Sequence, residues 1–580
     1  MKRRPRLIVF ETCGYPEALL MRILKLLGKS VSAINFVEGV ALPPVQTLPI
    51  GSNPVDRQDR CLQDLTDESF EAIERICQSP GKEPCDFYKK LSLAICTNDQ
   101  LKNELHIAMK ASLKKHAFPI AVIRSLLPDS DPRIVLVTRT RIRKKILKDS
   151  TSIRTVCIPF SDWPLKIIKS LRFGSHNPGA SISLPETRAS SAAVSSRVLF
   201  FPHKGLTYGS LYPWEQYFSE DPASPCHPDE LLFLDYQMNG GSLHKPLPFL
   251  REIFKLVPVT FRLIPLTFSV TSYQRLRFLF GALRLAAETR VLIRRLAKDH
   301  SHTSTALLTY EMLTPTSLSL ALKAAGIKRI ANLERGTAYL TGLPILVDVL
   351  LVPNGSLEAR LRQYSMCSAS EFLQVGHWRT DYLFDENIPP SKCDVLVLPY
   401  HVDGDCDRNW AGLATSCANF RQHTETVLTL CRTHPNLSFV IRTKNARWRE
   451  LPGLQDLIRK FLDAPNLAIA DDYSQKGFTY SLARSARLVI GRFSSVLEEL
   501  HDYGTPVLID NRGGVVDLEF RASQLTLPQA SVCNSGEELL RQASIILSNE
   551  LGSPAGRQPM CDGRVRQRIV AKIEQELNLR

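Results

Sequence analysis

The clearest candidate for chemistry is a turn in the last third of the chain, where the apolar segment Leu488–Gly491 runs into Arg492, Ser494 and Ser495. The serines stand where a helix is expected to begin, and free backbone N–H groups and the helix dipole attract anions at such a point. The pattern therefore predicts a phosphate-binding turn. The same residues also fit a purely structural role, in which Ser495 is an N-cap and Glu498 completes a capping box.

A second pair of charges stands at the end of another strand pattern, Ser438–Arg442. Arg442 ends this segment, and Lys444 comes two residues later. Two cations at the carboxyl end of a strand can hold a diphosphate through charge-assisted hydrogen bonds. We interpret them as a clamp for the same phosphate, with a solvated loop as the alternative explanation.

Candidate general bases lie in the middle of the chain, each after a segment with a strand pattern. His203 follows such a segment in a loop that contains two glycines, and Glu311 and Glu334 follow two others. A histidine or carboxylate placed at a strand end can take a proton from a hydroxyl near neutral pH. We predict this role for His203 or Glu334, while a structural histidine and surface ion pairs are the simpler alternatives.

The motifs of several other enzyme classes are missing. The sequence contains no GxxxxGK[ST], no GxGxxG after a strand, no HExxH and no GxSxG, which argues against P-loop, dinucleotide, zinc-protease and serine-hydrolase chemistry. The acidic run Asp403, Asp405 and Asp407 is a weak metal candidate, so no metal site is expected. The 14 cysteines form no CxxC pair and are interpreted as reduced thiols of a cytosolic protein.

The elements that must position these residues alternate between strand and helix patterns. Continuous apolar strands separated by helices indicate parallel sheets covered on both faces. We expect an α/β protein with two Rossmann-like, doubly wound domains that face a cleft, preceded by an additional N-terminal α/β region. Along the chain we expect an N-terminal region at 1–171, a Gly/Ser/Pro-rich linker at 172–196, one domain at 197–384, a second linker at 385–393 and the other domain at 394–580.

Composition and charge limit the partners. The chain has 580 residues, of which 44% are hydrophobic, and a formal net charge of +15. This excess favours anionic partners such as phosphorylated substrates or an anionic membrane surface. Nucleic acid is disfavoured, because no RNP, helix-turn-helix or zinc motif accompanies the charge. The basic segment 139–148 and the arginine-rich predicted helix 273–300 could each contact lipid head groups, or could be solvated helix faces.

The second half of the chain resembles GT-B-fold glycosyltransferases that build bacterial surface carbohydrates, near capsule enzymes and CDP-glycerol glycerophosphotransferases. The resemblance spans roughly residues 195–530 and is carried by two loose motifs. The matching residues are Val375, Gly376, Arg379 and Asp381 in the first motif, and Ser494, Ser495, Glu499, Gly504 and Pro506 in the second. The chain departs from the family at Thr443–Asn445 and Arg335–Gly336, where related enzymes often carry histidines.

The resemblance implies transfer of a sugar from a nucleotide-activated donor to a surface polysaccharide or a lipid-linked glycan, without a metal or other cofactor. The expected location is the cytoplasm, either free or attached peripherally to the inner face of the plasma membrane. Polyol-phosphate transfer from a CDP-glycerol-type donor and a non-catalytic role in polysaccharide assembly remain alternatives. The residues expected to bind the nucleotide are Arg442, Lys444, Arg492, Ser494, Ser495, Glu498 and Glu499.

Overall fold

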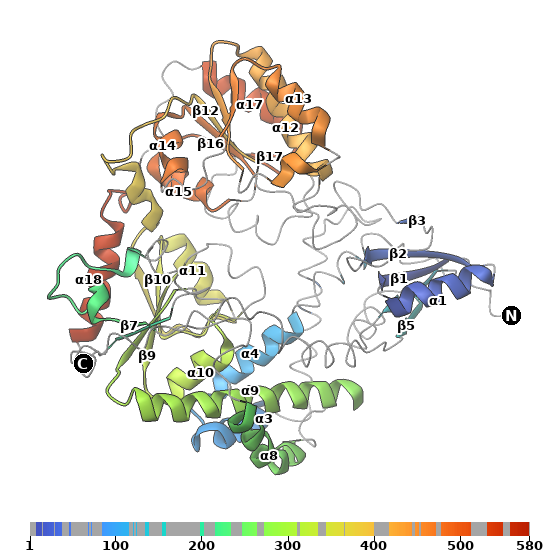
Figure 1. The fold of residues 1–580 in the computed structure, drawn as a ribbon, viewed down its shortest axis with the longest axis vertical. Helices are drawn as coiled ribbons and strands as arrows, with labels where there is room; N and C mark the ends of the chain where they lie inside the picture. Colours follow the sequence, from blue (N-terminus) through green and yellow to red (C-terminus); the bar gives the residue numbers. More distant parts are fainter. Residues whose placement is uncertain are drawn as a thin grey trace. The chain divides into compact units, whose positions relative to one another are not determined.

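The structure is a computed structural model of the 580-residue chain. It describes residues 7–13, 15–27, 29–36, 46–47, 68, 71, 84–114, 120, 123–124, 134–138, 154–157, 198–201, 215–233, 246–263, 272–309, 314–333, 344–364, 366–399, 417–443, 447–451, 454–470, 477–492, 494–511, 531–548 and 557–578. These residues form three parallel sheets with helices packed on them (Figure 1). The linker expected at 172–196 and the basic segment 139–148 lie outside the described residues.

The first sheet has the strand order β3-β2-β1-β4-β5, with every pairing parallel. Its strands are β1 (Leu7–Cys13), β2 (Ser30–Phe36), β3 (Gln46–Thr47), β4 (Ile134–Thr138) and β5 (Arg154–Cys157). Helix α1 (Tyr15–Leu26) connects β1 to β2. The apolar residues Leu7–Phe10 therefore lie in the central strand of a Rossmann-type sheet, with the order 3-2-1-4-5.

The second sheet has the order β11-β10-β9-β8-β6-β7. Its strands are β6 (Val198–Phe201), β7 (Leu232–Phe233), β8 (Thr305–Leu308), β9 (Lys328–Asn332), β10 (Val349–Val352) and β11 (Glu371–Gln374). The shorter elements between them are the 3-10 helices η3 (Glu215–Tyr217) and η4 (Pro228–Glu230), and the helices α10 (Thr316–Ala324) and α11 (Gly355–Gln363). The central strands are buried along their whole length, as their unbroken apolar sequences predict.

A layer of helices that belongs to the second sheet's unit is assembled from two distant parts of the sequence. Its members are α3 (Pro84–Cys96), α4 (Lys102–Lys114), α8 (Pro246–Leu263) and α9 (Ser272–Asp299). Leu91 and Leu105 from the first pair share one hydrophobic core with Leu256, Leu283 and Leu320. Helices expected to belong to the N-terminal region therefore complete the core of the middle domain.

The third sheet has the order β14-β13-β12-β15-β16-β17, which is the 3-2-1-4-5-6 order of a doubly wound Rossmann sheet. Its strands are β12 (Val395–Leu398), β13 (Phe439–Ile441), β14 (Leu467–Ile469), β15 (Leu488–Gly491), β16 (Val507–Asp510) and β17 (Val532–Cys533). The helices between them are α12 (Cys417–Thr433), η10 (Arg447–Glu450), α13 (Gln455–Leu462), α14 (Phe478–Ser485), α15 (Val496–Tyr503) and α17 (Gly536–Ser548).

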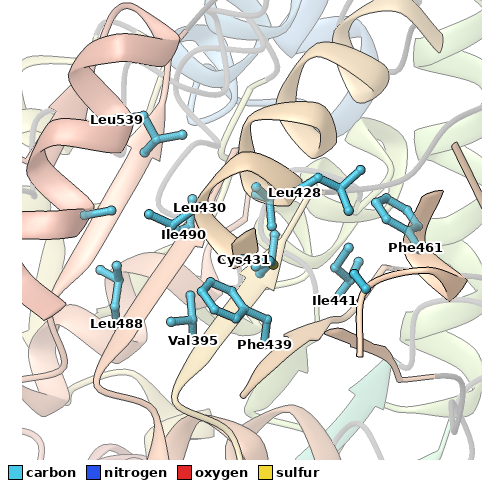
Figure 2. Close-up of a cluster of buried hydrophobic side chains, with 14 of the residues drawn as sticks. Val395, Leu428, Leu430, Cys431, Phe439, Ile441, Phe461, Leu488, Ile490 and Leu539 are labelled. Atoms are coloured by element: carbon cyan, nitrogen blue, oxygen red, sulfur yellow. The ribbon is translucent and has the colours of Figure 1, made fainter. Parts of the chain in front are cut away.

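The core of this third sheet forms where α12 covers the strands. Figure 2 shows Leu428 and Cys431 of this helix beside Val395, Phe439 and Ile441 of the sheet. All of these side chains are less than 5% exposed. Apolar side chains recurring at helical spacing thus meet a continuous apolar strand, as the sequence pattern predicts.

The chain divides into two compact units, whose limits differ from the expected domain limits. The first unit contains residues 1–73, 116–160 and 379–563, and the second contains residues 74–115, 161–378 and 564–580. Helix α18 (Val565–Asn578) thus packs with the second sheet, although the sequence pattern placed it in the last domain. Its side chain Arg568 donates to the carbonyl oxygen of Val375 at 2.9 Å.

The segment expected to be the second linker, 385–393, is tied to the third sheet's unit. Arg484 of α14 donates hydrogen bonds of 2.6 to 2.8 Å to the carbonyl oxygens of Tyr382, Asp385 and Ile388. A proline-containing composition therefore does not make this segment a free tether, because one guanidinium group holds two of its carbonyl groups and that of Tyr382 just before it. The α/β fold class with two Rossmann-like sheets after an additional N-terminal sheet is confirmed.

Candidate functional site

The candidate site lies at the point where the strand order of the third sheet reverses. Successive strands run outward from β12 through β13 on one side, and from β15 through β16 on the other. Ligands of doubly wound sheets bind beyond the carboxyl ends of the strands at this switch point. Arg442 follows β13 and Arg492 follows β15, so the two arginines leave the sheet at the same edge on either side of β12.

The turn from β15 into α15 is tight, and Gly491 makes it so. A Cβ atom at Gly491 would lie 2.7 Å from Cδ2 of Leu497 and 3.3 Å from Cβ of Leu398. Glycine therefore lets the first turn of α15 pack directly on β15 and β12. This is the close helix-to-strand approach that brings a helix N-terminus to the edge of a nucleotide-binding sheet.

The two serines of the turn have different roles. Ser494 accepts a hydrogen bond from the backbone N–H of Val496 at 3.3 Å, which satisfies one of the helix's free donors. Ser495 occupies the N-cap position, but its side chain makes no capping hydrogen bond. The capping box considered for Ser495 and Glu498 is thus not formed. The Ser495 hydroxyl is half-buried at the positive end of α15.

The two arginines are held by different surroundings. The backbone N–H of Arg492 donates to the carbonyl oxygen of Leu398 at 3.2 Å, and its side chain is 2% exposed. The Arg442 guanidinium lies 5.5 Å from the ring centre of Phe478, and its Nε is 3.5 Å from Oγ1 of Thr479. Arg442 is thus held against α14, whereas Arg492 is buried where β15 ends. Both arginines bring positive charge to this edge, and Arg442 is the more exposed of the two.

The two glutamates of α15 point into the protein. Glu498 and Glu499 are 1% and 2% exposed. The Tyr480 hydroxyl donates to Oε2 of Glu499, and Arg379 lies 3.5 Å from its Oε1. The Glu499 carboxylate therefore joins α14 and the segment after β11 to α15. Its two oxygens already have protein partners, so in this arrangement it holds α15 in position and does not contact a ligand.

Sequence reasoning missed one buried pair at the same edge. Nδ1 of His423 on α12 lies 2.7 Å from Oδ2 of Asp510, the last residue of β16, and both side chains are at most 1% exposed. Two features of the sequence could have indicated this pair: the acidic residue that ends the apolar strand Val507–Asp510, and a histidine on the helix that follows β12. The pair fixes α12 to the carboxyl end of β16, beside the switch point.

The remaining predicted site residues lie outside the described residues. They are His203, Glu311, Glu334, Lys444, Asp403, Asp405 and Asp407. Their roles stay predictions. Among the residues that the structure does describe, no group of three or more metal-ligating side chains is assembled. No helix in that same part of the chain has the length and apolar character needed to cross a membrane.

Comparison with known proteins finds similarity at the level of solved structures alone. No protein-family model and no curated protein matches the sequence. One similar structure is a co-structure of Staphylococcus aureus MnaA with UDP, with 13% identity, 66% of this chain and 96% of that chain covered, and a TM-score of 0.39. A second is MurG of Acinetobacter baumannii, with 15% identity, 50% and 78% covered, and a TM-score of 0.32. Anabaena HepE in complex with UDP and glucose has 10% identity, 66% and 99% covered, and a TM-score of 0.33.

Proposed function

We propose that this protein binds a nucleotide-activated sugar at the switch point of its third sheet and transfers the sugar to a glycan acceptor. The observation that supports the proposal is the meeting of Arg442, Arg492 and the start of α15 at one edge of a 3-2-1-4-5-6 sheet. Positive groups fixed in advance at such an edge suit the diphosphate of a nucleotide sugar.

The proposed chemistry is stabilisation of the leaving nucleotide diphosphate. As the bond between the sugar and the nucleotide diphosphate breaks, negative charge grows on the departing phosphate oxygens. Arg442, Arg492 and the Ser495 hydroxyl would stabilise this charge by hydrogen bonds that strengthen in the transition state. In the proposal these groups replace a metal ion, and Lys444 adds a further charge. His203 or Glu334 would take the proton from the acceptor hydroxyl.

The acceptor in the proposal is a surface polysaccharide or a lipid-linked glycan, as in capsule synthesis. The resemblance noted in the sequence supports this class of acceptor. A cytoplasmic protein at the inner face of the plasma membrane would meet both the soluble donor and a lipid-linked acceptor. These finer features belong to the proposal, together with the absence of a metal requirement.

The test is isothermal calorimetry with UDP, CDP and their nucleosides. Each charge-assisted hydrogen bond to a phosphate contributes about 1.5–3 kcal/mol, so Arg442→Ala should weaken nucleoside diphosphate binding by about 10- to 100-fold. Its effect on nucleoside binding should be much smaller, because the nucleoside carries no phosphate. Arg421→Ala is the matched control, since Arg421 lies on α12 and pairs with Asp456 at 2.7 Å.

The outcome of the test separates the proposal from its alternatives. Absence of affinity for any nucleotide would contradict it and favour a non-catalytic role in a polysaccharide assembly complex. Nucleotide binding followed by product formation from CDP-glycerol, and not from nucleotide sugars, would favour polyol-phosphate transfer. The mass of the product distinguishes these two transfer reactions.

A further inference from the structure

Helix α1 of the first sheet exposes an unusually apolar surface. Leu19 is 61% exposed, Ile23 45%, Leu26 87% and Leu27 67%. Their spacing of four, seven and eight residues places them in one stripe along the helix. These four account for nearly half of the large hydrophobic side chains that are exposed in the described part of the chain. Single exposed leucines are common on proteins, but a stripe of this kind marks a surface that binds something.

The stripe is not the face by which α1 packs on its own sheet. That face carries Met21, which is fully buried, together with the half-buried Leu20 and Leu24. Helix α1 lies against β1 and β2 (Figure 1). At about 100° per residue, Leu19 and Leu26 point away from this packed face. The helix therefore has two apolar faces, and the sheet uses one of them.

Positive charge accompanies the outward face. Arg22 and Lys25 are exposed, and in the helical projection Arg22 lies next to Leu26 and Leu19. An apolar stripe with exposed cations on one side is the pattern of helices that lie in the interface of an anionic membrane, with their leucines among the acyl chains and their cations at the head groups.

We propose that α1 docks this protein onto an anionic lipid bilayer through Leu19, Ile23, Leu26 and Leu27. Arg22 would meet lipid phosphates along the border of the stripe, and Lys25 follows Arg22 farther round the same side of the helix. A second copy of the chain is the less suitable partner. Two α1 helices related by a two-fold axis would bring the positive charges of both copies close together beside their contact. An anionic surface neutralises these charges instead.

The long helix α9, which the sequence singled out for membrane contact, lacks this combination. Its described side chains expose Arg284, Arg294, Arg295 and Lys298, but no large hydrophobic residue. Arg284 pairs with Glu288, and Arg294 pairs with Glu252. Cations without apolar anchors give weaker attachment than cations beside leucines. The inference about α1 suits a lipid-linked acceptor but does not depend on the proposed transferase activity.

The experiment is co-sedimentation of the full chain with large vesicles, either of phosphatidylcholine alone or of an equal mixture with phosphatidylglycerol. The wild-type protein should pellet with the anionic vesicles and much less with neutral ones. Each lysine or arginine near an anionic surface contributes about 1 kcal/mol, so the Arg22→Ser/Lys25→Ser variant should bind about 30-fold more weakly. Leu19→Ser/Ile23→Ser/Leu26→Ser should lower binding by about 100-fold or more.

The matched control variant removes exposed aliphatic side chains from two other helices. Leu462 is 77% exposed on α13 and Ile545 is 45% exposed on α17, so Leu462→Ser/Ile545→Ser should bind vesicles as the wild type does. All substituted side chains are exposed, so thermal unfolding should stay near that of the wild type. UDP affinity, measured on the same variants, reports separately on the proposed function.

Three results would overturn the proposal. The first is a wild-type protein that does not pellet with anionic vesicles. The second is an α1 leucine variant that pellets as well as the control variant. The third is a dimer in sedimentation velocity that the leucine substitutions dissociate, without any vesicle binding, which would assign the stripe to an interface between copies. A wild-type protein that binds anionic vesicles but not UDP would contradict the proposed transferase function and leave the inference about α1 unaffected.

Discussion

Arg329 of β9 donates two hydrogen bonds, of 2.7 and 2.6 Å, to the carboxylate of Glu104 in α4, 225 residues earlier in the chain. The Arg329 side chain is completely buried. Asp348 accepts from the same guanidinium at 3.0 and 2.9 Å. A buried cation between two carboxylates is tolerable because every charge has a hydrogen-bonded partner. The pair fixes α4 to the second sheet.

Removal of Glu104 should therefore destabilise the second unit strongly. Glu104→Ala leaves the buried Arg329 with one carboxylate, and breaking a buried pair from one side typically costs about 3–5 kcal/mol. Hydrogen exchange of the amides in β9 and α4 measures this loss within the unit concerned. The double variant Glu104→Met/Arg329→Met should recover only part of it, because Asp348 then loses the guanidinium and keeps Lys323 as its side-chain partner.

An exposed ion pair provides the control for this prediction. Arg421 also makes two hydrogen bonds of 2.7 Å with Asp456, but this pair lies at the surface. Asp456→Asn should change stability little, because water screens and replaces such interactions. An equal loss for Glu104→Ala and Asp456→Asn would show that burial adds nothing to the Glu104 interaction.

The same cluster should make the second unit sensitive to acid. Burial raises the pKa of the Asp348 carboxyl, but hydrogen bonds and charge from Arg329 outweigh burial and hold that pKa well below its usual range. Unfolding returns it to about 3.9, so the stabilisation is complete above about pH 5 and declines as the pH falls below that unfolded value. Urea unfolding between about pH 3 and pH 7 measures the decline, which Asp348→Asn should flatten.

Gly491 should not tolerate a side chain. Gly491→Ala places a Cβ atom 2.7 Å from Leu497 at the start of α15, and overpacking of this kind costs about 1–3 kcal/mol. Thermal unfolding measures this cost, and displacement of α15 should also lower UDP affinity. In contrast, Gly281→Ala in α9 meets nothing within 4 Å and should stabilise the helix slightly. A harmless Gly491→Ala would mean that the turn is looser than its geometry indicates.

The Tyr480 hydroxyl should contribute to the stability of the third sheet's unit. Tyr480→Phe leaves Oε2 of the buried Glu499 without its donor, which costs about 1–3 kcal/mol. Tyr503→Phe is the control, because Tyr503 contacts Phe384 and Arg557 through its ring. Chemical denaturation of both variants tests the difference. Equal stability would remove Tyr480 from the support of α15.

Four buried thiols should react slowly in the native protein. Burial raises the pKa of Cys226, Cys393 and Cys431 to about 12, and that of Cys561 to about 11. Only the thiolate is nucleophilic, so at about pH 8 alkylation by iodoacetamide should be far slower than in urea. Peptide mass spectrometry follows each site separately. Native labelling as fast as in urea would contradict the burial of that cysteine.

Local pattern was enough to locate most elements of the second and third sheets. The apolar segment Leu488–Gly491 coincides with β15, because a buried parallel strand is an uninterrupted apolar run between helices. The short edge strands β3 and β17 were not predicted. Each has two residues, and so short a segment carries no periodicity of its own.

Long-range partnership could not be predicted in the same way. Nothing in the sequence around Glu104 indicates Arg329 as its partner, and the helical patterns of α3 and α4 fit any core equally well. The candidate site was predicted in part, since Arg442, Arg492 and Ser495 all follow strands that share one edge. The inward direction of Glu499 was missed, because it depends on Tyr480 and Arg379 from two other elements.

The position of α18 has a consequence for synthesis of the chain. Lys328 of β9 pairs with Glu576 of this helix, and Glu576 is 5% exposed. The ribosome makes the entire third sheet after β9 and before α18. The second sheet is therefore without its last helix at a stage when the third sheet can already fold. Nascent chains that end before residue 564 should therefore keep an uncovered apolar surface and depend on chaperones.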